Sequence, residues 1–161
     1  MVKWGKRMIK YVKGNLFQAD TDIIAHQVNC MGVWGAGVAK QMRTRYPLAY
    51  EKYVDIVRTL GICLLGNCQI VRVAEPSIKP NTIANVFGQY NYGRDERYTD
   101  YTAIERGLER LHAYAGITNK TIAIPYKIGC GLGGGEWEKV KSLIEEIFSD
   151  EVVLKIYQLE D

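Results

Sequence analysis

The chain has 161 residues, which points to one domain large enough to bury its own core. Hydrophobic residues make up 47% and charged residues 24%, a balance that excludes disordered and fibrous proteins. The net charge of +3 is far below that of a chain built mainly to hold nucleic acid, and no apolar run reaches the roughly 18 residues of a membrane span. We therefore expect one cytoplasmic, monomeric domain over residues 1–161, with a basic extension at residues 1–7.

The four cysteines and two histidines show no spacing typical of a metal site. No Cys-x-x-Cys pair occurs, and neither histidine stands at ligand spacing from a cysteine. We expect reduced thiols packed as small hydrophobic groups, no metal ion and no cofactor.

The hydrophobic periodicity alternates between strand and helix along the chain. In chain order it predicts strands at 8–13 and 23–29, helices at 38–46 and 48–60, strands at 68–73 and 82–87, a helix at 98–115, a strand at 121–125, a helix at 136–148 and a strand at 152–157. Residues 88–98 form a polar, aromatic loop. This alternation predicts an α/β fold whose central sheet is covered on both faces and binds ligands at the carboxyl ends of its strands.

Two glycine-rich segments, 29–38 and 129–135, each connect an expected strand to an expected helix. Glycines let a backbone approach a ligand closely, and the free N–H groups at a helix N-terminus attract phosphate. One such segment alone is better explained as a flexible turn. Two of them favour a site that holds a diphosphate without lysine.

Two common nucleotide motifs do not explain these segments. The Walker pattern GxxxxGK[ST] is absent, so a conventional ATPase or GTPase is not expected. Gly129, Gly131 and Gly134 do spell GxGxxG, but only one helix and one strand follow, which is too little for a Rossmann unit.

Several segments together resemble the macrodomain family, from about Met8 onward. They are residues 12–17, 24–30, 35–39, 124–132 and 156–159. The resemblance is closest to the yeast-type ADP-ribose-1''-phosphate phosphatases and the human-type terminal ADP-ribose glycohydrolases. Cys-Met-Gly-Val-Trp-Gly-Ala-Gly at 30–37, Arg-Tyr-Pro at 45–47 and Leu-Leu-Gly-Asn-Cys at 64–68 favour the phosphatase branch.

The resemblance implies a three-layer α/β/α sandwich with a central mixed sheet of about six strands and a cleft for ADP-ribose. The backbones of 35–37 and 131–133 would hold the diphosphate, Asn15 would lie near the adenine amino group, and Asn29 would face the distal ribose. Tyr157 would pack on the adenine, although a core tyrosine is equally compatible. The full set expected to contact the ligand is Asn15, Leu16, Gly35, Ala36, Gly37, Val38, Gln89, Gly129, Gly131, Leu132, Gly133, Gly134 and Tyr157.

The chain departs from the glycohydrolase branch at two positions. That branch has a lysine nucleophile and an Asp just after the second-loop Gly-Cys-Gly-Leu. Here Gly133 stands at the Asp position, and Gly88 and Gln89 stand near the lysine position. A mechanism through a lysine adduct therefore lacks both parts.

His26 and Asn29 are the expected catalytic residues. They are three apart, so on an ideal strand they point to opposite faces, and only a bulge or the strand's end lets both reach one ligand. His26 could act as general acid or base in removing a terminal phosphate, and a hydrogen-bonded structural histidine is equally compatible.

The resemblance and the residues leave three functions open. The leading one is a metal-independent phosphatase that converts ADP-ribose-1''-phosphate to ADP-ribose and phosphate. The alternative is a domain that reads ADP-ribose on protein or nucleic acid, or a hydrolase that removes it. The third, an RNA-binding domain, rests only on mild basicity and 11 tyrosines.

Overall fold

The computed structural model describes residues 7–160, and all ten expected strands and helices are present. The elements are β1 (Ile9–Lys13), η1 (Leu16–Gln18), β2 (Ile23–Val28), α1 (Gly37–Arg45), α2 (Pro47–Leu60), η2 (Gly61–Leu64), β3 (Cys68–Arg72), β4 (Thr82–Phe87), α3 (Tyr101–Thr118), β5 (Ile122–Pro125), α4 (Trp137–Ile147) and β6 (Leu154–Gln158). The short 3-10 helices η1 and η2 were not predicted. Residues 1–6 of the predicted basic extension lie outside the described residues, while the Arg7 guanidinium bonds the Glu145 carbonyl on α4 at 3.3 Å.

The ends of α3 differ most from the predicted elements, since the helix spans Tyr101–Thr118 and not 98–115. The prediction began this helix at residue 98, whereas Thr99 pairs with Gln89 in an isolated antiparallel bridge that keeps it extended. The Asp100 side chain then accepts a hydrogen bond from the Ala103 N–H and caps the helix. A capping residue, and not hydrophobic periodicity, therefore decides where α3 begins.

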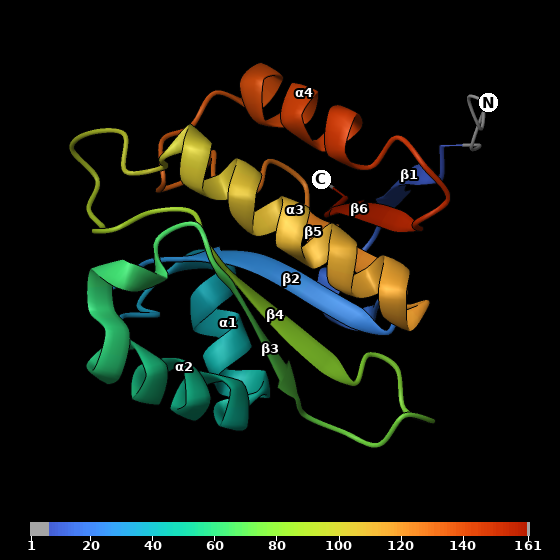
Figure 1. The fold of residues 1–161 in the computed structure, drawn as a ribbon, viewed down its shortest axis with the longest axis horizontal. Helices are drawn as coiled ribbons and strands as arrows, with labels where there is room; N and C mark the ends of the chain where they lie inside the picture. The colour runs from blue at the N-terminus through green and yellow to red at the C-terminus, as the bar shows by residue number, and fades with distance from the viewer. Residues whose placement is uncertain (1–6, 161) are drawn as a thin grey trace.

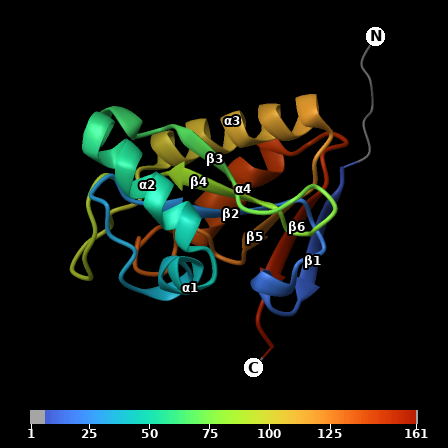
Figure 2. The same ribbon diagram turned by 90° about the horizontal axis from the view of Figure 1, so that it is seen from below.

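The six strands form one mixed sheet in the order β1-β6-β5-β2-β4-β3. Neighbouring strands are parallel except β3, which runs antiparallel to β4. Figures 1 and 2 show α3 and α4 over one face of the sheet and α1 and α2 over the other. This is the expected three-layer α/β/α sandwich.

Side chains of β2 alternate between the two layers of core because strand residues point to opposite faces in turn. Ile23 and Ala25 pack with α3 and α4, whereas Ile24 and Val28 pack with α1 and α2. Being covered on both faces, β2 reads as an almost continuous apolar run. His26 is the one strongly polar residue on the α1–α2 side of this run.

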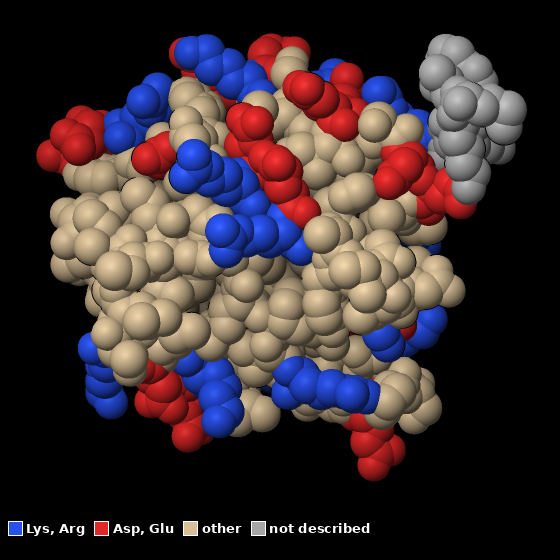
Figure 3. Space-filling view, in the orientation of Figure 1, with Lys and Arg blue, Asp and Glu red and all other residues tan. Residues whose placement is uncertain are grey.

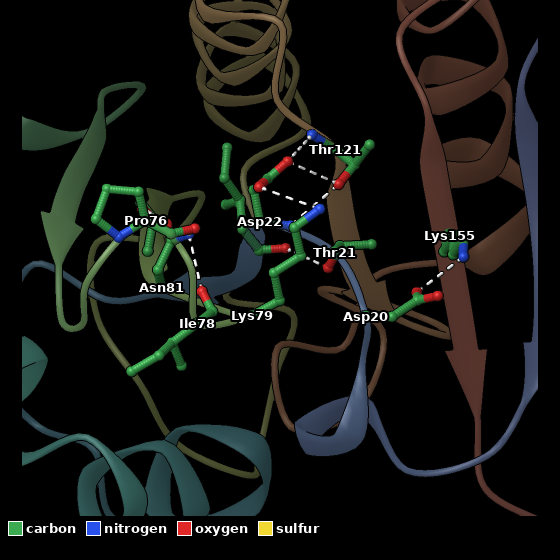
Figure 4. A network of polar contacts seen from close by, with 11 residues as sticks. Asp20, Thr21, Asp22, Pro76, Ile78, Lys79, Asn81, Thr121 and Lys155 are labelled. Carbon is green, nitrogen blue, oxygen red and sulfur yellow. Dashed lines mark hydrogen bonds and ion pairs between the residues drawn. The ribbon is translucent and has the colours of Figure 1, made fainter.

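A polar network joins the amino-terminal ends of three strands, at the end of the sheet opposite to the glycine loops (Figure 4). The Asp22 carboxylate accepts hydrogen bonds from the Thr121 N–H at 2.9 Å and hydroxyl at 3.0 Å, and Lys79 lies 3.7 Å away. Burial by itself raises the pKa of Asp22, but the bonds from Thr121 and the charge of Lys79 hold the pKa below its ordinary value. This end of the sheet is thus fixed by its own contacts, which leaves the carboxyl ends for a site.

Candidate ligand-binding cleft

Three segments that follow the carboxyl ends of β2, β4 and β5 meet at one end of the sheet, on the left in Figure 1. They enclose a cleft of about 600 Å³, within the range of roughly 300–1,000 Å³ that small-molecule sites occupy. Eleven residues predicted from the sequence line it: His26, Asn29, Gly35, Ala36, Gly37, Val38, Gln89, Gly129, Gly131, Leu132 and Gly133. Both predicted glycine loops therefore line the same cleft.

Unpartnered backbone N–H groups characterise both glycine loops. Within residues 7–160, the N–H groups of 35–37 and of 131–133 donate to no protein acceptor. The first set leads into α1, whose N-cap Ala36 has no side-chain oxygen and whose first turn holds no acidic residue. Such a helix N-terminus carries partial positive charge that favours an anion. Two rows of free donors in one cleft suit a ligand with two linked phosphates.

The first loop is held by the Asn29 side chain and by Tyr53 of α2. Asn29 Nδ2 donates to the Val33 carbonyl at 2.7 Å, and Oδ1 accepts from the Met31 N–H at 2.9 Å. The Tyr53 hydroxyl lies 2.7 Å from the same Oδ1 and accepts from the Gly32 N–H at 3.1 Å. Asn29 thus lines the cleft with its amide already engaged, and its contacts fix the loop.

The second loop is held in place by two polar side chains, Thr99 of the segment before α3 and Gln27 of β2. The Thr99 hydroxyl donates to the Gly129 carbonyl at 2.6 Å, and Gln27 Nε2 donates to Thr99 Oγ1 at 2.8 Å. The N–H groups of Tyr98 and Thr99 both donate to the Gly133 carbonyl. The carbonyls of Gly129 and Gly133 therefore face the 88–100 segment, while the N–H groups of 131–133 stay free.

His26 and Asn29 both line the cleft because β2 ends at Val28, so that Asn29 already lies beyond the strand. His26 is 1% exposed, and its Nε2 lies 2.8 Å from Asn85 Oδ1. Burial lowers the pKa of the imidazole from 6.5 to about 4, although the Asn85 hydrogen bond acts in the opposite direction. At neutral pH the ring is uncharged, which leaves an acceptor and not a general acid at Nδ1.

The low pKa of His26 predicts that acid weakens the fold. As the pH falls below 6.5, His26 becomes protonated in the unfolded chain, whereas in the folded protein its imidazole becomes protonated only near pH 4. The free energy of unfolding should therefore decrease across this window, by at most about 1.4 kcal/mol per pH unit for one proton. Urea denaturation at a series of pH values measures this slope.

The chain offers a matched control for that slope. His26→Gln should flatten the pH dependence between pH 6.5 and 4, whereas His112→Gln should keep the part assigned to His26, because it leaves that imidazole buried and bonded to Asn85. An equally steep slope in both variants would contradict the assignment to His26.

The Macro domain family profile matches residues 25–144 of this chain, from β2 into α4. The chain belongs to the Macro domain family. It is 29% identical to the ADP-ribose 1''-phosphate phosphatase of Saccharomyces cerevisiae (strain YJM789), with 94% of this chain and 98% of that protein covered.

A second group of relatives carries a different activity. The chain is 33% identical to the DNA ADP-ribosyl glycohydrolase of Thermus aquaticus, with 86% of this chain covered but only 37% of that longer protein. The solved macrodomain of Thermus aquaticus DarG superposes with a TM-score of 0.81 at 27% identity, covering 94% of this chain and 98% of that one. The fold therefore agrees with that of the DarG macrodomain, while the phosphatase is matched by sequence.

Four residues predicted to contact the ligand do not line the cleft of this macrodomain. Asn15 Oδ1 accepts from the Phe17 N–H at 2.9 Å and so caps η1. Leu16 and Tyr157 pack in the core between the sheet and the α1–α2 layer. Gly134 turns its N–H back to the Gly131 carbonyl at 3.0 Å. Roles of these four in binding stay predictions.

The charged side chains that line the macrodomain's cleft are both cations, Arg94 and Lys127, and both are exposed. No Asp or Glu of the described chain lines it. Neither cation was predicted from the sequence to contact the ligand, and Lys127 carries a φ of 59° that non-glycine residues rarely adopt. This charge balance suits an anionic ligand. It also agrees with the glycine at position 133, where the glycohydrolase branch has Asp.

Proposed function

We propose that this macrodomain binds ADP-ribose in the cleft and hydrolyses the phosphoester of ADP-ribose 1''-phosphate. The observation that carries the proposal is the pair of free N–H rows at 35–37 and 131–133, which fit the two phosphates of the ligand. The relative that shares 94% of this chain's length is a phosphatase of that ester. The sequence-derived ligand contacts outside the cleft are not needed for this proposal.

Hydrolysis would proceed by attack of water on the terminal phosphorus. The phosphorus–oxygen bond to the ribose breaks, and that oxygen takes up a proton to give ADP-ribose and inorganic phosphate. Arg94 and Lys127 supply positive charge for the terminal phosphate, and the neutral His26 supplies a hydrogen-bond acceptor for water. With a pKa of about 4 this imidazole holds the water's proton weakly, so we assign it the orientation of water.

Calorimetric titration tests the binding half of the proposal. ADP-ribose should bind at least about a hundredfold more tightly than AMP, because only the former carries a diphosphate between two sugars. ADP serves as the control for the diphosphate alone. Equal affinity for ADP-ribose and AMP would contradict the assignment of the glycine loops.

Phosphate release from ADP-ribose 1''-phosphate tests the catalytic half. We expect turnover that persists in EDTA, since no group of three or more His, Cys, Asp or Glu is placed to hold a metal among residues 7–160. Binding without turnover would instead favour a reader of ADP-ribosylated macromolecules. An ADP-ribosylated DNA oligonucleotide is the matched substrate for the glycohydrolase alternative, which the relative in Thermus aquaticus suggests.

The RNA-binding alternative has weaker support. Figure 3 shows Lys and Arg intermixed with Asp and Glu on the visible face, with no field of one sign that would favour RNA binding.

No helix within residues 7–160 is long and apolar enough to cross a membrane. The monomeric state and the cytoplasmic location stay predictions.

A further inference from the structure

A chain of side-chain hydrogen bonds leads from the backbone of α2 to His26 at the cleft. Gln69 Nε2 donates to the Lys52 carbonyl at 3.1 Å, and Asn85 Nδ2 donates to Gln69 Oε1 at 3.0 Å. Asn85 Oδ1 in turn lies 2.8 Å from His26 Nε2. The sheet register produces this order, since Gln69 stands opposite Asn85 and Asn85 stands opposite His26 on three adjacent strands.

The Lys52 carbonyl, at the start of this series of hydrogen bonds, decides which atom donates and which accepts in every bond that follows. A backbone carbonyl can only accept, so Gln69 must present its NH₂ to Lys52 and its oxygen to Asn85. Asn85 must then donate to Gln69 and present its own oxygen to His26. Because an amide oxygen cannot donate, His26 Nε2 must carry the proton. The lone pair of the neutral ring is therefore at Nδ1.

His26 Nδ1 is buried and has no hydrogen-bond partner among residues 7–160. The same holds for Nε1 of Trp34, whose ring meets the imidazole edge-on with ring centroids 4.8 Å apart. Both residues line the cleft. Buried polar atoms without a partner are rare in folded proteins and call for an explanation, such as a ligand or a water molecule.

We propose that Asn85 and Gln69 are positioning residues that hold His26 as the Nε2–H tautomer, so that Nδ1 accepts a hydrogen bond from a ligand hydroxyl or a water in the cleft. Trp34 Nε1 is a second buried donor without a partner among the residues that line the cleft. The role of the ligand rests on the proposed function. The tautomer does not, because it follows from the protein's own hydrogen bonds.

Nitrogen NMR of the labelled protein tests the tautomer without any substrate. The chain has two histidines, so His112→Gln leaves only the signals of His26. At neutral pH we expect Nε2 to show the chemical shift of a protonated ring nitrogen and Nδ1 that of an unprotonated one. An Nδ1–H tautomer, or a charged ring, in the otherwise unchanged protein would overturn the proposal.

Gln69→Leu tests the relay itself. It removes the acceptor that orients the Asn85 amide, so His26 should become a mixture of tautomers and its two nitrogen shifts should move toward each other. Gln41→Leu, an exposed amide on α1, is the matched control and should leave both shifts unchanged. If Gln69→Leu leaves the shifts of His26 as in the parent protein, Gln69 is not a positioning residue.

Asn85→Asp tests the consequence for the ligand. A carboxylate against Nε2 favours the charged ring, and Nδ1 then donates instead of accepting. We expect kcat for ADP-ribose 1''-phosphate to fall by at least about tenfold while KM changes by less than about threefold. An unchanged kcat would overturn the role of Nδ1. If Asn85→Asp does not fold, the same kinetic comparison on Gln69→Leu decides the question.

The two proposals can fail separately. A parent protein that neither binds ADP-ribose nor releases phosphate contradicts the proposed function, and the tautomer of His26 is still decided by NMR. A parent protein that is active but shows the opposite tautomer contradicts only the relay.

Discussion

Replacing Asn29 with alanine is expected to lower the free energy of unfolding by about 3 kcal/mol and to weaken ADP-ribose binding by at least about tenfold. The side chain is 6% exposed and bonds the backbone of Met31 and Val33 as well as the Tyr53 hydroxyl. Each neutral bond contributes about 1 kcal/mol, and the variant leaves buried partners unsatisfied. The N–H row at 35–37 follows this loop and loses its fixed position.

Urea denaturation and calorimetric titration measure the two effects of Asn29→Ala. Tyr53→Phe is the graded control, because it removes one hydroxyl from the same cluster and should cost about 1–2 kcal/mol. If Asn29 acted only on the ligand, as its predicted place at the distal ribose implies, Asn29→Ala would leave the stability within about 0.5 kcal/mol and reduce binding alone.

Replacing Gly133 with alanine is expected to reduce ADP-ribose affinity by about a hundredfold or more and to lower the free energy of unfolding by about 2–3 kcal/mol. A Cβ at this position would lie 2.5 Å from Thr99 Oγ1 and 2.8 Å from the Gly129 carbonyl oxygen. The second of these atoms is backbone, so the loop itself must move. Moving it displaces the free N–H groups of 131–133.

Gly131→Ala is the control for that variant, since its Cβ would meet no atom within 4 Å and its φ is not in the left-handed region. We expect its stability to equal that of the parent protein. Thr99→Ala combined with Gly133→Ala should recover only part of the loss, because the contact with Gly129 remains. Affinity for ADP-ribose equal to that of the parent in Gly133→Ala would contradict this account.

The same contacts explain why the chain departs from the glycohydrolase branch. An Asp at position 133 would carry a Cβ, and Thr99 and Gly129 leave no room for that atom. At Gly88 the contact differs, because a Cβ there would lie 2.2 Å from Oε1 of the Gln27 side chain and not against backbone. We therefore expect Gly133→Asp to lose ADP-ribose binding and not to gain glycohydrolase activity.

Several features of the fold and the site were predictable from the sequence. Hydrophobic periodicity gave every strand and helix of the α/β/α sandwich, with the largest shifts at the ends of α3. The two glycine loops were predictable because glycines between a strand and a helix have a local cause, a backbone that must approach a ligand. The replacement of the glycohydrolase branch's Asp by Gly133, and of its lysine near Gly88 and Gln89, was also visible in the residues themselves.

Only the tertiary structure decided what holds these loops. Asn29 meets Tyr53 across 24 residues, Thr99 meets the Gly129 carbonyl across 30, and Gln27 meets Gln89 across 62. None of these contacts can be predicted from hydrophobic periodicity, because a single hydrogen bond depends on where two distant segments meet and not on neighbouring residues. Sequence alone therefore predicted the two loops that line the cleft, and the tertiary structure determined which side chains shape and support those loops.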